Sequence, residues 1–181
     1  MKQIIVDIEA DGLLDQATKI HVMSWHNIET EEKGSTKNYD TMRHMLTTHG
    51  LIGHNLVAYD VPLVEKLLDI KVEGTIIDTL PLSWYLEPQR IRHGLDDWGK
   101  TLGVEKPKID DWDSLTYEEY RHRCEEDVKI NHMLWKRLER KLRNLYRDEG
   151  ERQKLVDYLT FKMECARDQE AYGWKLDVAG A

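Results

Sequence analysis

The chain has 181 residues, of which 40% are hydrophobic, so it can bury the core of one ordinary domain and is not disordered throughout. With 34 acidic and 26 basic side chains its formal net charge is −8, which argues against a protein that holds nucleic acid by bulk charge alone. This balance leaves open an enzyme that binds divalent cations through carboxylates, and with no apolar run near 18 residues we expect no membrane partner.

The first 86 residues alternate between short apolar strands and helices. Strands are predicted where β-branched or other apolar residues cluster, at residues 2–8, 19–26, 35–39, 51–53 and 74–78. Helices are predicted between and after them, at residues 40–49, 60–68 and 79–86. This order predicts an α/β fold in which helices flank one mixed five-stranded sheet.

The rest of the chain is mostly helical in pattern. Helices are predicted at residues 94–102, 116–146 and 152–172. Thr116 and Glu119 have the spacing of a capping box at the start of the second of these helices. The charged segment 104–113 predicts a surface loop. We therefore expect one domain at residues 1–149, followed by a helical segment at 150–181.

Two carboxylates stand at the end of the first predicted strand. Because side chains alternate along a strand, Asp7 and Glu9 share one face with Ile5. Such a pair is repulsive unless it is protonated or bridged by cations. A strand end that turns its acids into solvent is the simpler alternative, so this segment alone indicates a cation site without establishing one.

Two further carboxylates come from predicted helices. Asp60 stands at a helix start, where Asp is a favoured N-cap but can also face a cleft. Asp127 lies near the middle of an apolar helical stripe that includes Leu134 and Leu138. A carboxylate there is costly unless it is paired, hydrogen-bonded or bound to metal, so a buried salt bridge is the alternative. Together, four carboxylates from three segments match what two divalent cations need for in-line displacement at phosphorus.

Taken in order, these segments resemble the three motifs of the DnaQ-like (DEDD) superfamily of 3′–5′ exonucleases. The resemblance is greatest to the N-terminal proofreading exonuclease domain of bacteriophage family A DNA polymerases. The motifs correspond to residues 6–13, 53–62 and 124–128, within a likeness that covers about residues 1–145. The resemblance implies a ribonuclease H-like fold and a metal-dependent exodeoxyribonuclease that releases nucleoside 5′-monophosphates from the 3′ end of single-stranded DNA.

The resemblance also implies roles for individual residues. The catalytic carboxylates, which would bind two divalent cations (Mg²⁺ or Mn²⁺), would be Asp7, Glu9, Asp60 and Asp127. Leu13 would wedge between the last two bases of the strand. Asn55 and Tyr59 would contact the strand near the scissile phosphate or order the second motif. For Leu13 and Tyr59, ordinary packing is the alternative.

One position departs from the superfamily pattern. Members usually have Tyr four residues before the last Asp, or His five residues before it, to orient the attacking water. Here these positions hold Arg123 and His122. In a regular helix His122 points about 140° and Arg123 about 40° away from Asp127. We expect a helix break near Arg121 that brings His122 into the site as a catalytic residue. There are two alternatives. Arg123 could replace the usual Tyr as a clamp on the substrate phosphate, or no side chain could take the place of that Tyr.

Residues 166–177 resemble the segment that leads into the polymerase domain of the same family. We therefore expect a polymerase domain or subunit, missing from this chain, as a partner; the chain is either cut from a longer polymerase or a separate subunit. A 3′–5′ exoribonuclease of the same fold and a non-catalytic module that binds a nucleic-acid end are the rival functions. Two cysteines are too few for a disulfide framework and indicate a cytoplasmic protein, in the host bacterium if a phage encodes it.

Overall fold

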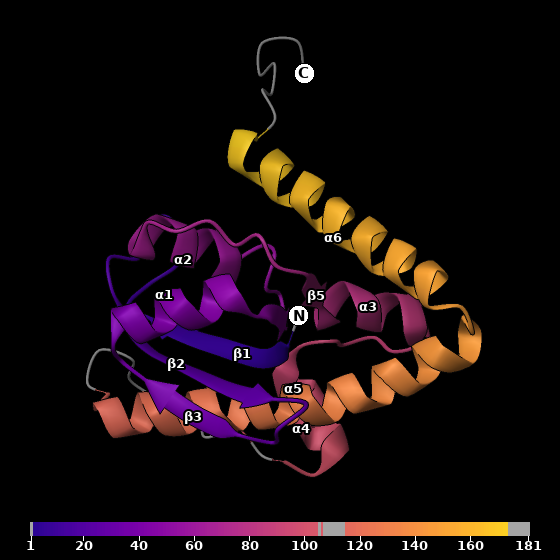
Figure 1. Cartoon of the computed structure of the whole chain (residues 1–181), viewed down its shortest axis with the longest axis horizontal. Helices are drawn as coiled ribbons and strands as arrows, with labels where there is room; N and C mark the ends of the chain where they lie inside the picture. The colour runs from indigo at the N-terminus through magenta and orange to yellow at the C-terminus, as the bar shows by residue number, and fades with distance from the viewer. Residues whose placement is uncertain (1, 105, 107–114, 174–181) are drawn as a thin grey trace, which may run out of the picture.

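A mixed five-stranded sheet forms the centre of the molecule (Figure 1). The computed structural model describes residues 2–104, 106 and 115–173. The strands follow the spatial order β3–β2–β1–β4–β5 and are β1 (Gln3–Ala10), β2 (Ile20–Asn27), β3 (Lys33–Thr36), β4 (Gly50–Gly53) and β5 (Ile76–Asp78). The β1–β2 and β2–β3 pairs are antiparallel, whereas β1–β4 and β4–β5 are parallel.

Helices cover both faces of this sheet. They are α1 (Tyr39–Thr48), α2 (Asp60–Leu68), α3 (Thr79–Leu86), α4 (Leu95–Leu102), α5 (Tyr117–Leu145) and α6 (Glu149–Tyr172). In Figure 1, α1 and α2 lie on one side of the sheet and the long α5 lies on the other. The predicted fold class, a mixed five-stranded sheet flanked by helices, is confirmed. No helix among the described residues combines the length and the apolar character that crossing a bilayer requires.

Alternate residues of β1 contribute to two cores. Ile4, Val6 and Ile8 pack in the core that α1 and α2 cover. Ile5 belongs to the opposite core, where it packs with residues of α5 such as Leu138. Burying one such side chain completely contributes about 1.5–3 kcal/mol, so this alternation fixes which face of β1 meets α5.

The helix α5 begins at the predicted capping box. Thr116 accepts a hydrogen bond from the Glu119 backbone N–H at 3.4 Å, and the Glu119 carboxylate accepts one from the Thr116 backbone N–H at 2.7 Å. The helix then continues without interruption to Leu145, so the break expected near Arg121 does not form. Farther along, Cys124 Sγ donates to the Asp7 carbonyl oxygen at 3.1 Å, which ties α5 to the end of β1.

The last helix, α6, packs on the body over much of its length (Figure 1). Val156 and Leu159 share the core of α5, Met163 is buried, and Arg167 Nη1 donates to the Val57 carbonyl oxygen at 3.4 Å. The helix starts earlier than predicted because Asp148 caps it, accepting from the Glu151 backbone N–H at 3.0 Å. The domain division at residue 149 stays a prediction. Residues 174–177 of the polymerase-like segment, and most of the loop predicted at 104–113, lie outside the described residues.

Candidate active site

Three of the four predicted carboxylates meet between the sheet and α5. Oxygens of Asp7 and Glu9, from the end of β1, and of Asp127, from α5, all lie within 4.8 Å of one another. The Glu9 side chain is 14% exposed and that of Asp127 is 7% exposed. A register shift between Glu9 and Ala10 interrupts the pairing of β1 with β2 beside this group. β-Bulges, which shift the register in this way, often re-aim a side chain next to a functional site.

Asp60 approaches the same group from α2. It is the first residue of α2 and is buried, but the N-cap is Tyr59, which makes no side-chain cap bond, so Asp60 is not the cap residue. Burial above all, and then the neighbouring charges of Asp127, Glu9 and Asp60, raise the pKa of Asp7 well above its usual range. All four predicted carboxylates therefore influence one another at one place.

The electrostatics of this group favour a bound cation. Burial raises the pKa of Glu9 to about 7 despite the opposing charge of Arg123, and burial also raises the pKa of Asp127 against the opposing charge of Lys106. Buried carboxylates in such proximity must either share protons or bind cations. The Asp127 Oδ1 atom is buried and has no hydrogen-bond partner among the described residues. Hard oxygen ligands of this kind suit Mg²⁺ and Mn²⁺, so the residues present fit such ions.

Two cationic side chains reach the carboxylates. Arg123 Nε lies 3.1 Å from Glu9 Oε1, and Lys106 Nζ lies 2.7 Å from Asp127 Oδ2 with its side chain only 11% exposed. Sequence reasoning missed Lys106, because a Lys in a charged loop far from Asp127 along the chain belongs to no periodic pattern. By contrast, His122 is exposed on the uninterrupted α5. His122 therefore does not lie beside the carboxylates. The prediction that α5 breaks near Arg121 and brings His122 into the site is wrong.

Asp78, at the end of β5, organises the loop of the second motif. Its carboxylate accepts hydrogen bonds from the backbone N–H groups of Asn55 at 2.9 Å, Val57 at 3.1 Å and Leu80 at 3.0 Å. Asn55 has φ of +65°, a left-handed conformation that Asn adopts more readily than most residues. Burial raises the pKa of Asp78 to about 6. The backbone of Asn55 thus helps to order the loop before Asp60, and a contact of its side chain with substrate stays a prediction.

Leu13 and Tyr59 line an open cleft of about 690 Å³ together with Glu9. The Tyr59 hydroxyl donates to the Gly12 carbonyl oxygen at 2.7 Å, which joins the second motif to the loop after β1. Asp11 closes the base of that loop by accepting from the Thr18 backbone N–H at 2.8 Å. Leu13 is 74% exposed, so ordinary packing does not explain it. The loop displays an apolar side chain in the cleft that contains Glu9.

Comparisons with known proteins find solved structures that share this fold. No protein-family model and no curated protein matches the sequence. NrnC from Brucella melitensis bound to pGG matches with a TM-score of 0.69 and 16% identity, over 97% of this chain and 88% of that chain. NrnC from the same organism with bound Mg²⁺ matches with a TM-score of 0.62, 17% identity and 97% and 89% coverage.

Two further structures are another nuclease and a polymerase. RNase D from Escherichia coli, an exoribonuclease involved in structured RNA processing, matches with a TM-score of 0.61 and 13% identity, over 90% of this chain and 45% of that one. Phi29 DNA polymerase complexed with primer-template DNA matches with a TM-score of 0.53 and 14% identity, over 78% and 31%. At these identities the likeness shows the fold alone. The chain has the ribonuclease H-like fold found in 3′–5′ exonucleases.

Proposed function

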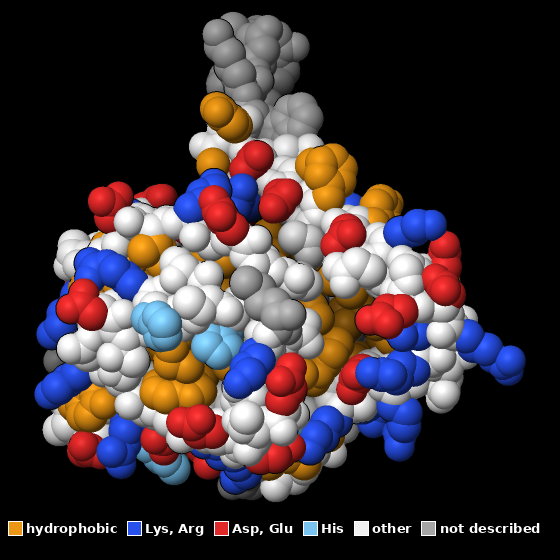
Figure 2. All heavy atoms as spheres, viewed as in Figure 1, with side chains coloured by type: hydrophobic (Ala, Val, Ile, Leu, Met, Phe, Trp, Pro, Cys, Tyr) orange, Lys and Arg blue, Asp and Glu red, His pale blue; other side chains and the backbone are white. Residues whose placement is uncertain are grey.

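We propose that this chain is a metal-dependent 3′–5′ exonuclease that hydrolyses the terminal phosphodiester of a single-stranded nucleic acid and releases nucleoside 5′-monophosphates. The observation that carries the proposal is the meeting of Asp7, Glu9 and Asp127, with Asp60 close by, beside an open cleft. The ribonuclease H-like fold supports it. Acidic and basic side chains are interspersed over the face shown in Figure 2, which fits a protein that binds a strand end locally rather than by a broad basic surface.

In this proposal Asp7, Glu9 and Asp127 would hold one divalent cation, and Asp7 and Asp60 would hold a second. When bound, Mg²⁺ or Mn²⁺ would lower the pKa of the attacking water and offset negative charge at the scissile phosphate. The buried carboxylates hold their positions because β1 and α5 are fixed by the core. Their proposed role is to bind the two ions and to orient them.

The remaining predicted residues position the strand. Leu13 contacts the terminal bases from its exposed place in the cleft, and Tyr59 holds the loop that carries it. Arg123 lies close enough to Glu9 to bind the substrate phosphate, but a guanidinium stays protonated and is a poor base. His122 has no part in this arrangement, because the helix turns it away.

The finer proposal is a proofreading exonuclease that acts on single-stranded DNA for a phage-type family A polymerase, with the polymerase domain or subunit as partner. The order of the three motifs and the likeness to Phi29 DNA polymerase support it. The greater likeness to NrnC bound to pGG and to RNase D supports the alternative, a 3′–5′ exoribonuclease. Contacts with the 2′-hydroxyl of the terminal sugar would distinguish the two substrates.

Excision of a labelled 3′ end tests the proposal. DNA and RNA strands of the same sequence are incubated with wild type, with Asp127→Asn, and with a matched control, Glu126→Gln, which alters the adjacent carboxylate that pairs with Lys129 at 3.2 Å. We expect Mg²⁺-dependent release by wild type and by the control, and a loss of roughly 100-fold or more in Asp127→Asn. The absence of metal-dependent release by wild type from both strands would refute the catalytic proposal. The preferred strand decides between DNA and RNA.

A further inference from the structure

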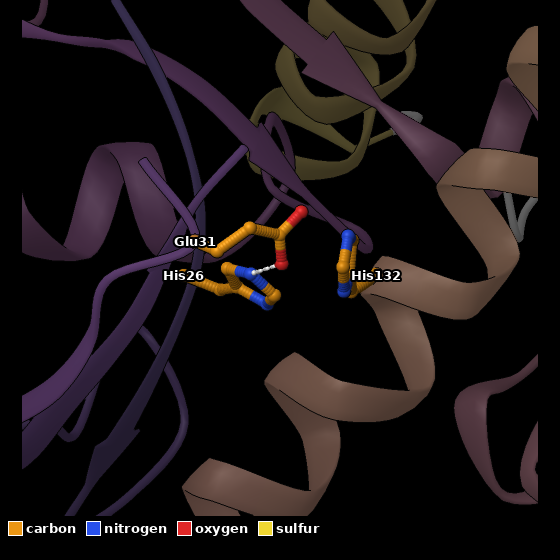
Figure 3. Close-up of side chains that lie close together, drawn as sticks. All are labelled: His26, Glu31 and His132. Carbon is orange, nitrogen blue, oxygen red and sulfur yellow. Dashed lines mark hydrogen bonds and ion pairs between the residues drawn. The ribbon is translucent and has the colours of Figure 1, made fainter. Parts of the chain in front are cut away.

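A second group of possible metal ligands lies outside the three motifs. His26 lies on β2, Glu31 follows β2 in the turn before β3, and His132 lies on α5. Their ligand atoms all lie within 4.8 Å of one another, and Figure 3 shows the three side chains facing one another. His132 follows Asp127 by five residues, which places it roughly 7 Å further along α5 and on a different side of that helix. The group is therefore separate from the carboxylates of the proposed active site.

The two imidazoles are close and well shielded. His26 Nε2 lies 2.8 Å from Glu31 Oε2, and the rings of His26 and His132 meet edge-on with centroids 3.9 Å apart. His26 is 1% exposed and His132 is 9% exposed. An imidazole binds a metal ion through a ring nitrogen in its neutral form.

The turn before β3 holds Glu31 in place. Glu31 has φ of +61°, which is uncommon for a residue with a side chain, and its backbone N–H donates to the Asn27 carbonyl oxygen at 2.9 Å. The Asn27 side chain accepts from the backbone N–H groups of Glu29 at 2.9 Å and Thr30 at 3.1 Å. These bonds fix the backbone conformation from which the Glu31 carboxylate reaches the two rings.

We propose that His26, Glu31 and His132 bind one late first-row divalent cation, Zn²⁺ above all. Two imidazoles and one carboxylate form a nitrogen and oxygen ligand set that Zn²⁺ takes in proteins, with the fourth position left to water. Mg²⁺ prefers oxygen ligands only, so the two sites select different ions. His26 and His132 line an open pocket of about 530 Å³, through which an ion can enter. The bound ion would link β2, the turn and α5.

Two nearby lysines, Lys33 and Lys136, oppose a cation at His132. Lys136 Nζ lies 4.0 Å from Glu31 Oε1, but its side chain is 62% exposed and can turn into solvent when the cation binds. An exposed pair of this kind contributes little to stability. The cost of displacing it is therefore small beside the free energy that binding of structural Zn²⁺ releases.

Zinc binding tests this site directly. Wild type is titrated with Zn²⁺ in excess Mg²⁺, in competition with a chromophoric chelator, beside Glu31→Gln and His132→Gln. The matched control is His44→Gln, at an exposed His on α1. All proteins carry Cys165→Ser, which removes the thiol that is partly exposed. We expect one Zn²⁺ per chain, bound at least tenfold more weakly by both ligand variants and unchanged by the control. Co²⁺ bound in the same place should give the visible absorption of a four-coordinate ion in wild type only.

Two outcomes would overturn the site. One is Zn²⁺ binding that is equal in wild type and in both ligand variants; the other is no binding by a wild type whose circular dichroism shows that it is folded. The His26–Glu31 contact would then be an ordinary hydrogen bond. The Asp127→Asn variant should retain this Zn²⁺ binding while it loses excision. A lack of Zn²⁺ binding would therefore leave the proposed exonuclease function unaffected. A lack of excision would likewise leave the proposed Zn²⁺ site unaffected.

Discussion

Replacing Asp7 with Asn should stabilise the metal-free protein while it abolishes excision. Asp7 lies at the end of β1 with oxygens of Glu9 and Asp127 within 4.8 Å, and burial and these like charges raise its pKa well above the usual range. The amide has the same shape but carries no charge, so it removes the repulsion. It also removes a proposed metal ligand. Stability and activity should therefore change in opposite directions.

The size of the effect follows from the distances. Two unit charges 4.8 Å apart repel by roughly 3.5 kcal/mol at an effective dielectric constant of about 20. The cluster relieves part of this repulsion by taking up a proton, and Lys106 and Arg123 offset more of it through their contacts with Asp127 and Glu9. We expect the free energy of unfolding to rise by about 1–2 kcal/mol without divalent cations. Saturating Mg²⁺ should reverse the order, because only wild type gains the full free energy of binding.

Urea unfolding of wild type, Asp7→Asn and Asp15→Asn, each in EDTA and in Mg²⁺, measures this effect. Asp15 is an exposed carboxylate in the loop after β1, so its variant should stay within about 0.5 kcal/mol of wild type. Excision of a labelled 3′ end is followed with the same proteins. An Asp7→Asn protein less stable than wild type in EDTA would show that the carboxylates do not repel one another, and the reasoning from like charges would be refuted.

Four further substitutions separate roles at and near the site. His122→Ala should leave the excision rate unchanged across pH, because His122 does not reach the carboxylates. Arg123→Ala removes the side chain that lies 3.1 Å from Glu9, and it should slow excision about tenfold. Equal excision rates in the two variants would contradict these placements of His122 and Arg123. Because the Leu13 side chain is 74% exposed, Leu13→Ala should change the free energy of unfolding by less than about 0.5 kcal/mol. The same substitution should weaken binding of a single-stranded 3′ end several-fold, as measured by fluorescence anisotropy. Burial lowers the pKa of His54 to about 4 from 6.5, so the unfolded chain binds more protons between these values. The stability that His54 contributes is complete above pH 6.5 and falls as the pH drops toward 4. The wild-type free energy of unfolding should therefore be lower at pH 5 than at pH 8, and His54→Gln should reduce that difference by about 2 kcal/mol. A variant that shows the same difference as wild type would contradict the assignment to His54.

Local pattern was enough to predict the fold class and much of the carboxylate group. Alternation along β1 puts Asp7 and Glu9 on the face of Ile5, and helical periodicity puts Asp127 in a core-facing stripe. Both predictions depend only on the spacing of neighbouring residues. The bounds of α2 and α3 were predicted to the residue for the same reason, because their start and stop signals lie within a few residues of each helix.

Contacts between distant segments were not predictable in this way. Whether α5 breaks near Arg121 depends on its packing against the sheet, and the unbroken helix excluded His122 from the carboxylates. Lys106 reaches Asp127, and Asp78 holds the second motif, through bonds that span about 20 residues of chain.

The sequence by itself thus determined the kind of sheet, the face on which the acids stand and the chemistry they suit, because periodicity is a property of adjacent residues. Only the tertiary structure showed which basic side chains, Lys106 and Arg123, pair with those acids. It alone also showed that His26, Glu31 and His132 meet at a second place. The physical reason is that β2, its turn and α5 are brought together by burial of the core, and the positions of their polar side chains follow from that packing rather than from local spacing.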